Sequence, residues 1–383
     1  MTIEELRAEA RAWIAAHRDV AVPAHGAHLP HDHVPGERDR RWLDAARDGG
    51  WVCLSWPERY GGRALSELEI IAVNEEFARA GVRRPDLGMG ETLVAPALLA
   101  HGTPEQKDHF LPRVRSGEDV YCQGFSEPET GSDLARLRTR GTVEDGAVRV
   151  TGHKIWTSHG RAANMMFLLC RTDPDAPRHR GLSYVLLPLD GGGVDMRPIR
   201  QLTGGSGFCE EFLDGAVAPL FNVIGGVNGG WRVAMTTLGA ERAGEITGQY
   251  FGYRREFDAL LGRLRARDRL GDPDVRRALA RAYVRVELMR HTGRRVADEM
   301  AAGRDVSALL AIDKINWSEY HCDFGSLALD AQGPAGLLRP PGDGYPVDEF
   351  QQVMLGSRGR RIARGTNQIQ RDIIAGRVLG LPR

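Results

Sequence analysis

Apolar residues recur along this chain at two different spacings, and the change of spacing divides it into three parts. Up to about residue 118 the spacing is helical, as in the run Leu65, Leu68, Ile71 and Ala72. From about residue 119, short β-rich runs such as AVRV, NMMFLLC and LSYVLLPL alternate with turn-rich segments such as EDG and LDGGG. Helical spacing returns after Gly230. The pattern predicts helices, then strands, then helices.

Capping signals and one long apolar stripe indicate individual helices. Thr103, followed by Pro104 and Gln106, predicts a helix that begins with a capping box, and we expect a further helix after Thr366. One helical stripe continues through much of the third part; its members are Val275, Leu279, Ala282, Val286, Met289 and Val296.

The order of these elements argues against a doubly wound parallel sheet, because helices and strands do not alternate. We expect an α+β protein with three domains. These are an N-terminal helical domain (1–118), a central antiparallel β-domain (119–225) and a C-terminal helical bundle domain (226–383).

Charge and composition narrow the class of protein. Acidic and basic residues balance at 51 each, which argues against a partner held by bulk charge, such as nucleic acid. The five cysteines are far apart and the N-terminus has no secretory pattern, so we expect free thiols in a cytoplasmic protein. No run of 18 apolar residues predicts a membrane span. Only three of the 51 basic residues are lysines (Lys107, Lys154, Lys314), which codon bias in a GC-rich genome explains.

The usual nucleotide and hydrolase motifs are absent from the sequence. There is no Gly-x-Gly-x-x-Gly after a strand, no P-loop, no His-Glu-x-x-His and no Gly-x-Ser-x-Gly. The segment HGAHLPHDH brings together His25, His28, His31 and His33. Because it lies in a loop with no regular ligand face, we interpret it as a solvated loop and expect no metal site.

Two stretches of the β region could contact an aromatic cofactor. Residues 122–135 (CQGFSEPETGSDLA) offer main-chain N–H groups and the hydroxyls of Ser126 and Ser132 to an electron-rich ring or a phosphate. Residues 150–160 place Trp156 on a strand before two hydroxyl residues, where the indole could stack beside a cofactor. An ordinary turn and a core tryptophan are the alternatives.

A third stretch, residues 229–245, points to a general base. Trp231, Ala234, Met235 and Leu238 define an apolar helical face, and Glu241 is the next position on it. Desolvation on such a face raises the pKa of a carboxylate, as a general base requires. The equally good alternative is a core ion pair of Glu241 with Arg242 or another arginine.

Taken together, these stretches resemble the acyl-CoA dehydrogenase family over nearly the whole chain. The matching segments, in family order, are WPERYGG (56–62), GTPEQKDHFLPRVRSGE (102–118), FSEPETGSD (125–133), GHKIWTSHG (152–160), GWRVAMTTLGAER (230–242) and RGTNQIQRDIIAGRVLGLPR (364–383). The resemblance implies a C-terminal four-helix bundle and a homodimer or homotetramer around FAD. It also implies α,β-dehydrogenation of an acyl thioester, on CoA or a carrier protein, with an electron-transfer flavoprotein as acceptor.

The resemblance also assigns site residues. Those expected to contact FAD are Phe125, Ser126, Trp156, Ser158, Arg254, Gln332, Gly333, Thr366 and Gln368. Those expected near the substrate are Ser132, Arg242, Arg364 and Gly365.

Four positions depart from the family pattern. Many members carry the catalytic glutamate where this chain has Arg364, and a guanidinium cannot act as a base. In another branch, which includes isovaleryl-CoA-type members, the base lies at the position of Glu241, which we therefore predict as the catalytic residue. Asp258 stands where an FAD-binding Gly is common, and Asp330 and Pro334 stand where Gln and Gly are common in the family's Gln-x-x-Gly-Gly loop.

Two alternative functions stay open. One is a flavin oxidase or monooxygenase of the same fold, which no feature of the sequence favours. The other is a partner subunit of a hetero-oligomer, in which only some of the flavin sites are complete; the altered FAD positions argue for it and Glu241 argues against it.

Overall fold

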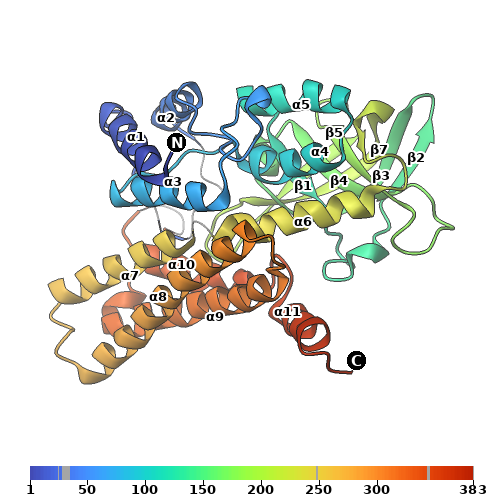
Figure 1. Ribbon diagram of the computed structural model, residues 1–383. Coiled ribbons are helices and arrows are strands. Elements are labelled where there is room, and N and C mark those ends of the chain that lie inside the picture. The colour runs from blue at the N-terminus through green and yellow to red at the C-terminus, as the bar shows by residue number, and fades with distance from the viewer. Residues whose placement is uncertain (25, 28–34, 247–248, 343–345, 383) are drawn as a thin grey trace.

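The computed structural model describes residues 1–24, 26–27, 35–246, 249–342 and 346–382, without the side chains of 241–246 and 249. Figure 1 shows three parts: helices, a twisted sheet and a second set of helices. The α+β class is therefore confirmed. The four histidines of the segment HGAHLPHDH lie outside the described residues. Among the described helices, none combines the length and the low charge needed to cross a bilayer.

The N-terminal part consists of α1 (Ile3–Ala16), α2 (Glu37–Asp48), α3 (Glu67–Arg79), α4 (Ala95–His101) and α5 (Pro104–Ser116). The predicted capping box opens α5, because Thr103 Oγ1 accepts from the Gln106 N–H and Gln106 Oε1 accepts from the Thr103 N–H. One aromatic cluster packs between these helices; its members are Trp13, Trp42, Trp51 and Phe77. The core of this part is continuous with one face of the sheet.

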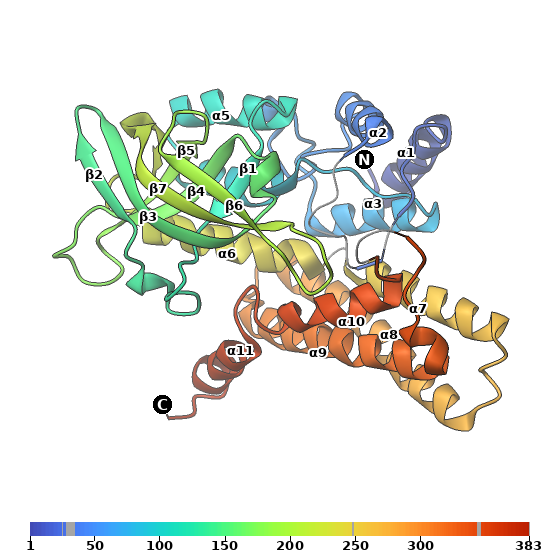
Figure 2. The same ribbon diagram turned by 180° about the vertical axis from the view of Figure 1, so that it is seen from behind.

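The sheet has the order β6-β7-β3-β2-β4-β5-β8, and β1 pairs with β4 (Figure 2). Its strands are β1 (Tyr121–Gly124), β2 (Arg140–Glu144), β3 (Ala147–Ser158), β4 (Met165–Arg171), β5 (Leu182–Pro188), β6 (Val194–Ile199), β7 (Phe208–Pro219) and β8 (Val223–Ile224). Most neighbours are antiparallel, but β1 runs parallel to β4. This pairing is possible because the intervening chain, which includes β2 and β3, is long enough for a crossover. All five cysteines are buried and free, as expected.

The C-terminal part consists of α6 (Gly230–Ile246), α7 (Gln249–Ala266), α8 (Pro273–Ala301), α9 (Ser307–Gln332), α10 (Glu349–Arg360) and α11 (Asn367–Ile373). The six residues of the predicted stripe in α8 are all buried, which confirms it. Thr366 caps α11, as expected, by accepting from the Ile369 N–H. Helix α11 packs on α9 and projects beyond the bundle.

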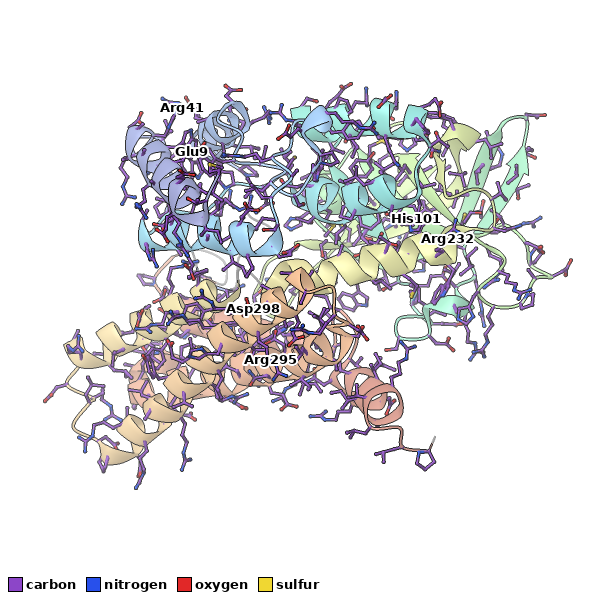
Figure 3. The ribbon with its side chains drawn as sticks, viewed as in Figure 1. Glu9, Arg41, His101, Arg232, Arg295 and Asp298 are labelled. Atoms are coloured by element: carbon purple, nitrogen blue, oxygen red, sulfur yellow. The ribbon has the colours of Figure 1, made fainter. Side chains whose placement is uncertain are left out.

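Helix α6 connects the three parts of the molecule. It packs against α4 and β5 on one side and against α8 and α9 on the other (Figure 1). At its N-terminal half, Arg232 lies beside His101 of α4 (Figure 3), and His101 Nε2 is 2.7 Å from Thr236 Oγ1. Burial, reinforced by the positive charge of Arg232, lowers the pKa of His101, so the imidazole is neutral at this junction.

The buried face of α6 differs in part from the predicted stripe. Val233, Ala234 and Thr237 are fully buried, whereas Met235 is 39% exposed and Trp231 is only partly buried. The prediction was wrong at Met235 because α6 is covered from two sides, so that no single apolar stripe describes its contacts.

Candidate active site

Two of the predicted cofactor segments lie side by side in the sheet. Phe125 and Ser126 directly follow β1, and the Ile155 N–H of β3 donates to the Ser126 carbonyl at 3.0 Å. The Phe125 ring is buried edge-on against Phe167 and Tyr184. Ser158, at the end of β3, is partly buried. The fold thus brings together residues that are about thirty positions apart in sequence.

Trp156 is the most exposed member of this group. Its side chain is 57% exposed, although it lies in a strand of a large sheet, and its ring meets Phe208 edge-on. The backbone at Trp156 is left-handed, with φ +65°, at a register shift between β3 and β7. A left-handed non-glycine residue is strained, and such strain concentrates at functional sites. The bulge presents a flat, exposed indole one residue beyond the backbone bond of Ile155 to Ser126, as stacking on an aromatic cofactor requires.

A buried ion pair supports these two segments from behind. Lys154, fully buried in β3, donates to the Phe125 carbonyl at 3.1 Å and to Glu127 Oε1 at 3.0 Å. Glu127 also accepts from the Arg138 and Thr139 N–H groups. Burial lowers the pKa of Lys154, and Glu127 opposes that shift. Burial raises the pKa of Glu127, but Lys154 and the hydrogen bonds outweigh it, so the carboxylate stays ionised.

The C-terminal motif forms a tight turn between α10 and α11. Arg364 and Gly365 both have left-handed backbones, with φ +59° and +83°. The left-handed backbone at Gly365 would strain any other residue, and an added Cβ would also lie 2.6 Å from Gln370 Nε2, so the turn favours glycine. Arg364 and Thr366 are partly buried, and Gln368 is exposed on α11.

Asn367 anchors this turn to α9. Its Oδ1 accepts from Lys314 Nζ at 2.6 Å and from Ser318 Oγ at 2.9 Å, and Lys314 also donates to the Arg361 carbonyl. Burial lowers the pKa of Lys314 to about 8, so the ammonium is still charged at pH 7.

Two predicted FAD contacts are already engaged within this chain. Arg254 pairs with Asp258 at 2.9 Å and with Glu287 at 3.0 Å. Gln332 is buried; it donates to the Ala328 carbonyl and accepts from Arg267. Gly333 follows it with φ +62°.

The predicted base and its neighbour lie at the C-terminal half of α6. Position 241 is one turn beyond the buried Thr237, which is where a base on the buried face of α6 should lie. The side chains of Glu241 and Arg242 lie outside the described part of the chain. Ser132 is exposed in the loop that follows Ser126. The assignments of these residues therefore stay predictions.

Sequence patterns missed the residues that support the site. Lys154, Glu127, Lys314 and Asn367 were not singled out, because each acts through a partner distant in sequence. One signal could have found two of them: the chain has only three lysines among its 51 basic residues, and two of these, Lys154 and Lys314, are buried.

The fold is the α+β arrangement expected of a flavin-dependent dehydrogenase, and comparison with known proteins specifies the family. Models described as the N-terminal, middle and C-terminal domains of acyl-CoA dehydrogenase match residues 2–118, 122–214 and 228–379. Acyl-CoA dehydrogenase IpdE1 of Mycobacterium tuberculosis is 39% identical, over 100% of this chain and 98% of that protein. The chain belongs to the acyl-CoA dehydrogenase family, whose members are FAD-dependent oxidoreductases.

Solved structures agree with this membership. A protein described as "Tcur3481-Tcur3483 steroid ACAD" has a TM-score of 0.84 and 31% identity, with 100% of this chain and 98% of that chain covered. A chain of the ChsE4-ChsE5 complex from Mycobacterium tuberculosis has a TM-score of 0.79 and 27% identity, with 100% and 99% covered.

The described residues fit the ring end of FAD better than its adenosine end. The exposed indole of Trp156 and the adjoining Ser126 backbone suit a flat, electron-rich ring. At the other end, Arg254 and Gln332 are both held by neighbours within this chain.

Proposed function

We propose that the chain catalyses α,β-dehydrogenation of an acyl-CoA thioester, with Glu241 as the base that removes the α-proton. The observation that supports this assignment is the position of residue 241 on α6, the helix that passes between the sheet and the bundle. Arg364 stands where many members have their base, and its guanidinium stays protonated. The carboxylate of Glu241 therefore acts as the base that Arg364 cannot provide.

The remaining site residues position the reactants. FAD, when bound, supplies the two-electron acceptor that takes the β-hydride. The backbone and hydroxyl of Ser126, with Phe125, would hold the ring system, together with Trp156 and Ser158 of β3. Thr366 and Gln368 would hold the rest of the cofactor. The α-proton moves to Glu241, and a double bond forms between the α and β carbons.

The proposed substrate is a bulky acyl group on CoA. The relatives support this choice, since two solved structures with 31% and 32% identity are described as a steroid acyl-CoA dehydrogenase and its variant. Ser132, Arg242, Arg364 and Gly365 contact the thioester or the acyl group. A fixed guanidinium at 364 suits a polar or anionic group on the acyl chain.

The proposed assembly is an oligomer that reduces an electron-transfer flavoprotein. A heterotetramer is favoured over a homo-oligomer by the engagement of Arg254 and Gln332 within this chain and by the complex ChsE4-ChsE5. The FAD content and mass of the purified chain, alone and with a co-expressed partner, test this point. Full FAD occupancy of the chain alone, in a homotetramer, would exclude the heterotetramer.

Substitution of the base tests the proposed activity. Glu241→Gln is expected to lower the rate of acyl-CoA-dependent flavin reduction by at least about 100-fold, because the amide cannot accept the α-proton. Glu245→Gln, one turn further along α6, is the matched control and should reduce at near the wild-type rate. The assignment fails if Glu241→Gln reduces normally while FAD remains bound.

A further inference from the structure

A second carboxylate, Glu211, lies buried behind the cofactor-facing bulge. It is in β7, opposite Lys154 in the register of β3, and is fully buried. Glu211 Oε2 is 2.6 Å from Thr157 Oγ1, and Thr157 Oγ1 is 3.1 Å from the Gln123 carbonyl of β1. Within the described chain, Oε1 has no hydrogen-bonding partner. Thr157 directly follows Trp156, so these bonds join the bulge to β1 and to β7.

A count of hydrogens shows which form of Glu211 completes this chain of bonds. Thr157 has a single hydroxyl hydrogen and two acceptors within reach. If Glu211 is ionised, the hydrogen goes to the carboxylate, and the Gln123 carbonyl loses its donor. If Glu211 is protonated, its O–H donates to Thr157 Oγ1, and Thr157 donates to the Gln123 carbonyl. The protonated form therefore satisfies both contacts.

The surrounding charges also favour the neutral form. The titratable groups near Glu211 are Lys154 of β3, Cys122 of β1 and Cys209 of its own strand, together with Glu210, the preceding residue of β7, whose side chain lies on the opposite face of the sheet. Lys154 is committed to Glu127, so a second buried carboxylate would leave an excess negative charge. Burial, with a contribution from Glu210, raises the pKa of Glu211 to about 7, although Thr157 and Lys154 oppose the shift.

We propose that Glu211 is a positioning residue that stays protonated, donates a hydrogen bond to Thr157 Oγ1 and thereby fixes the Gln123 carbonyl and the Trp156 bulge. The proposal rests on the proposed function, in that FAD lies against this bulge. Deprotonation would withdraw the Thr157 hydrogen from the Gln123 carbonyl and loosen the junction of β1 and β3. The proton on Glu211 therefore controls how firmly the cofactor is held.

The first experiment locates the proton without any use of FAD. Infrared difference spectra of wild type against Glu211→Gln, at about pH 5.5 and pH 8.5, should show a carboxylic-acid carbonyl band in wild type that disappears at the higher pH. Glu210→Gln, which alters the adjacent and partly exposed carboxylate, should keep this band. In Glu210→Gln the pH at which the band disappears should be lower than in wild type, because the charge of Glu210 raises the pKa of Glu211.

The second experiment measures FAD affinity against pH. In wild type, affinity should fall about ten-fold as the pH rises through about 7, which corresponds to one hydrogen bond. Glu211→Gln keeps a donor for Thr157 and should bind FAD with no such pH dependence. Glu211→Leu cannot accept the Thr157 hydrogen, so Thr157 donates to the Gln123 carbonyl at every pH, and FAD affinity in this variant should likewise show no fall through about pH 7.

The outcomes separate this proposal from the proposed function. Absence of the carboxylic-acid band, or the same pH profile of FAD affinity in wild type and Glu211→Gln, would overturn the role of Glu211. If the protein shows the band and its transition but binds no FAD, the hydrogen bonds from protonated Glu211 through Thr157 to the Gln123 carbonyl stand. That result would instead overturn the proposed flavin-dependent activity, and with it the control of FAD binding by Glu211.

Discussion

At the scale of single residues, two buried lysines explain how the site is held. Lys154 fixes the Phe125 carbonyl beneath the first cofactor segment, and Lys314 fixes Asn367 beneath the C-terminal turn. A slender stem with one compact charge fits an enclosed site where the wide guanidinium fork of arginine does not. In this arginine-rich chain, lysine thus occupies two enclosed positions that require a narrow side chain with a compact charge.

Replacement of Lys154 by methionine should destabilise the protein by about 3–5 kcal/mol, because Glu127 would be left as an uncompensated buried charge. Denaturant unfolding measures this loss. The double variant Lys154→Met/Glu127→Gln should recover part of it, and Lys107→Met, on α5, should change stability by no more than about 0.5 kcal/mol. Equal stability of the single and double variants would show that the pair is not coupled.

The proton on Glu211 also predicts a pH-dependent stability. The folded protein holds this proton up to about pH 7, whereas an ordinary glutamate loses it near 4.5. Between these values the folded state binds more protons, so the stability that the group contributes falls as the pH rises. Unfolding midpoints of wild type should therefore fall relative to Glu211→Gln across this window; parallel curves would contradict a raised pKa.

At the scale of elements, the position of α11 depends on one polar anchor. Asn367, the first residue of α11, is buried and accepts from two side chains of α9. The turn before it contains Arg364 and Gly365, both with left-handed backbones. The anchor therefore fixes the turn that carries the predicted substrate and cofactor contacts.

Replacement of Asn367 by leucine should release α11 and cost about 2–3 kcal/mol, since the Lys314 ammonium would lose its acceptor in a buried site. Trypsin cleavage after Arg371 and Arg377, followed by mass spectrometry, should accelerate before the rest of the chain unfolds. Asp372→Asn, on the exposed face of α11, is the matched control and should be cleaved like wild type. Unchanged cleavage in Asn367→Leu would show that other contacts hold α11.

At the scale of the whole molecule, features encoded locally could be predicted from the sequence. The α5 capping box and the buried stripe of α8 depend on residues within a few turns, and the structure confirms both. The exposure of Met235 was mispredicted because it depends on what packs around α6. The pairs Lys154–Glu127 and Thr157–Glu211 join residues far apart in sequence, through strand registers that no local pattern specifies.

The same limit applies to the candidate site. The resemblance assigned Phe125, Ser126 and Trp156, and the fold places them together at one bulge. The engagement of Arg254 by Asp258 and Glu287 needed the structure, because Glu287 lies on a different helix. Whether a partner chain completes the adenosine end of the site is therefore a property of the assembly and not of this chain's motifs.

The most direct test of the central claim is anaerobic titration of the purified protein, alone and with a co-expressed partner, with a panel of acyl-CoA thioesters. The flavin absorption band is followed throughout. A flavin band that bleaches with at least one bulky acyl-CoA, and stays bleached without oxygen, is the result expected for FAD-dependent α,β-dehydrogenation. A flavin band that no acyl-CoA bleaches, or no flavin in either preparation, would contradict it.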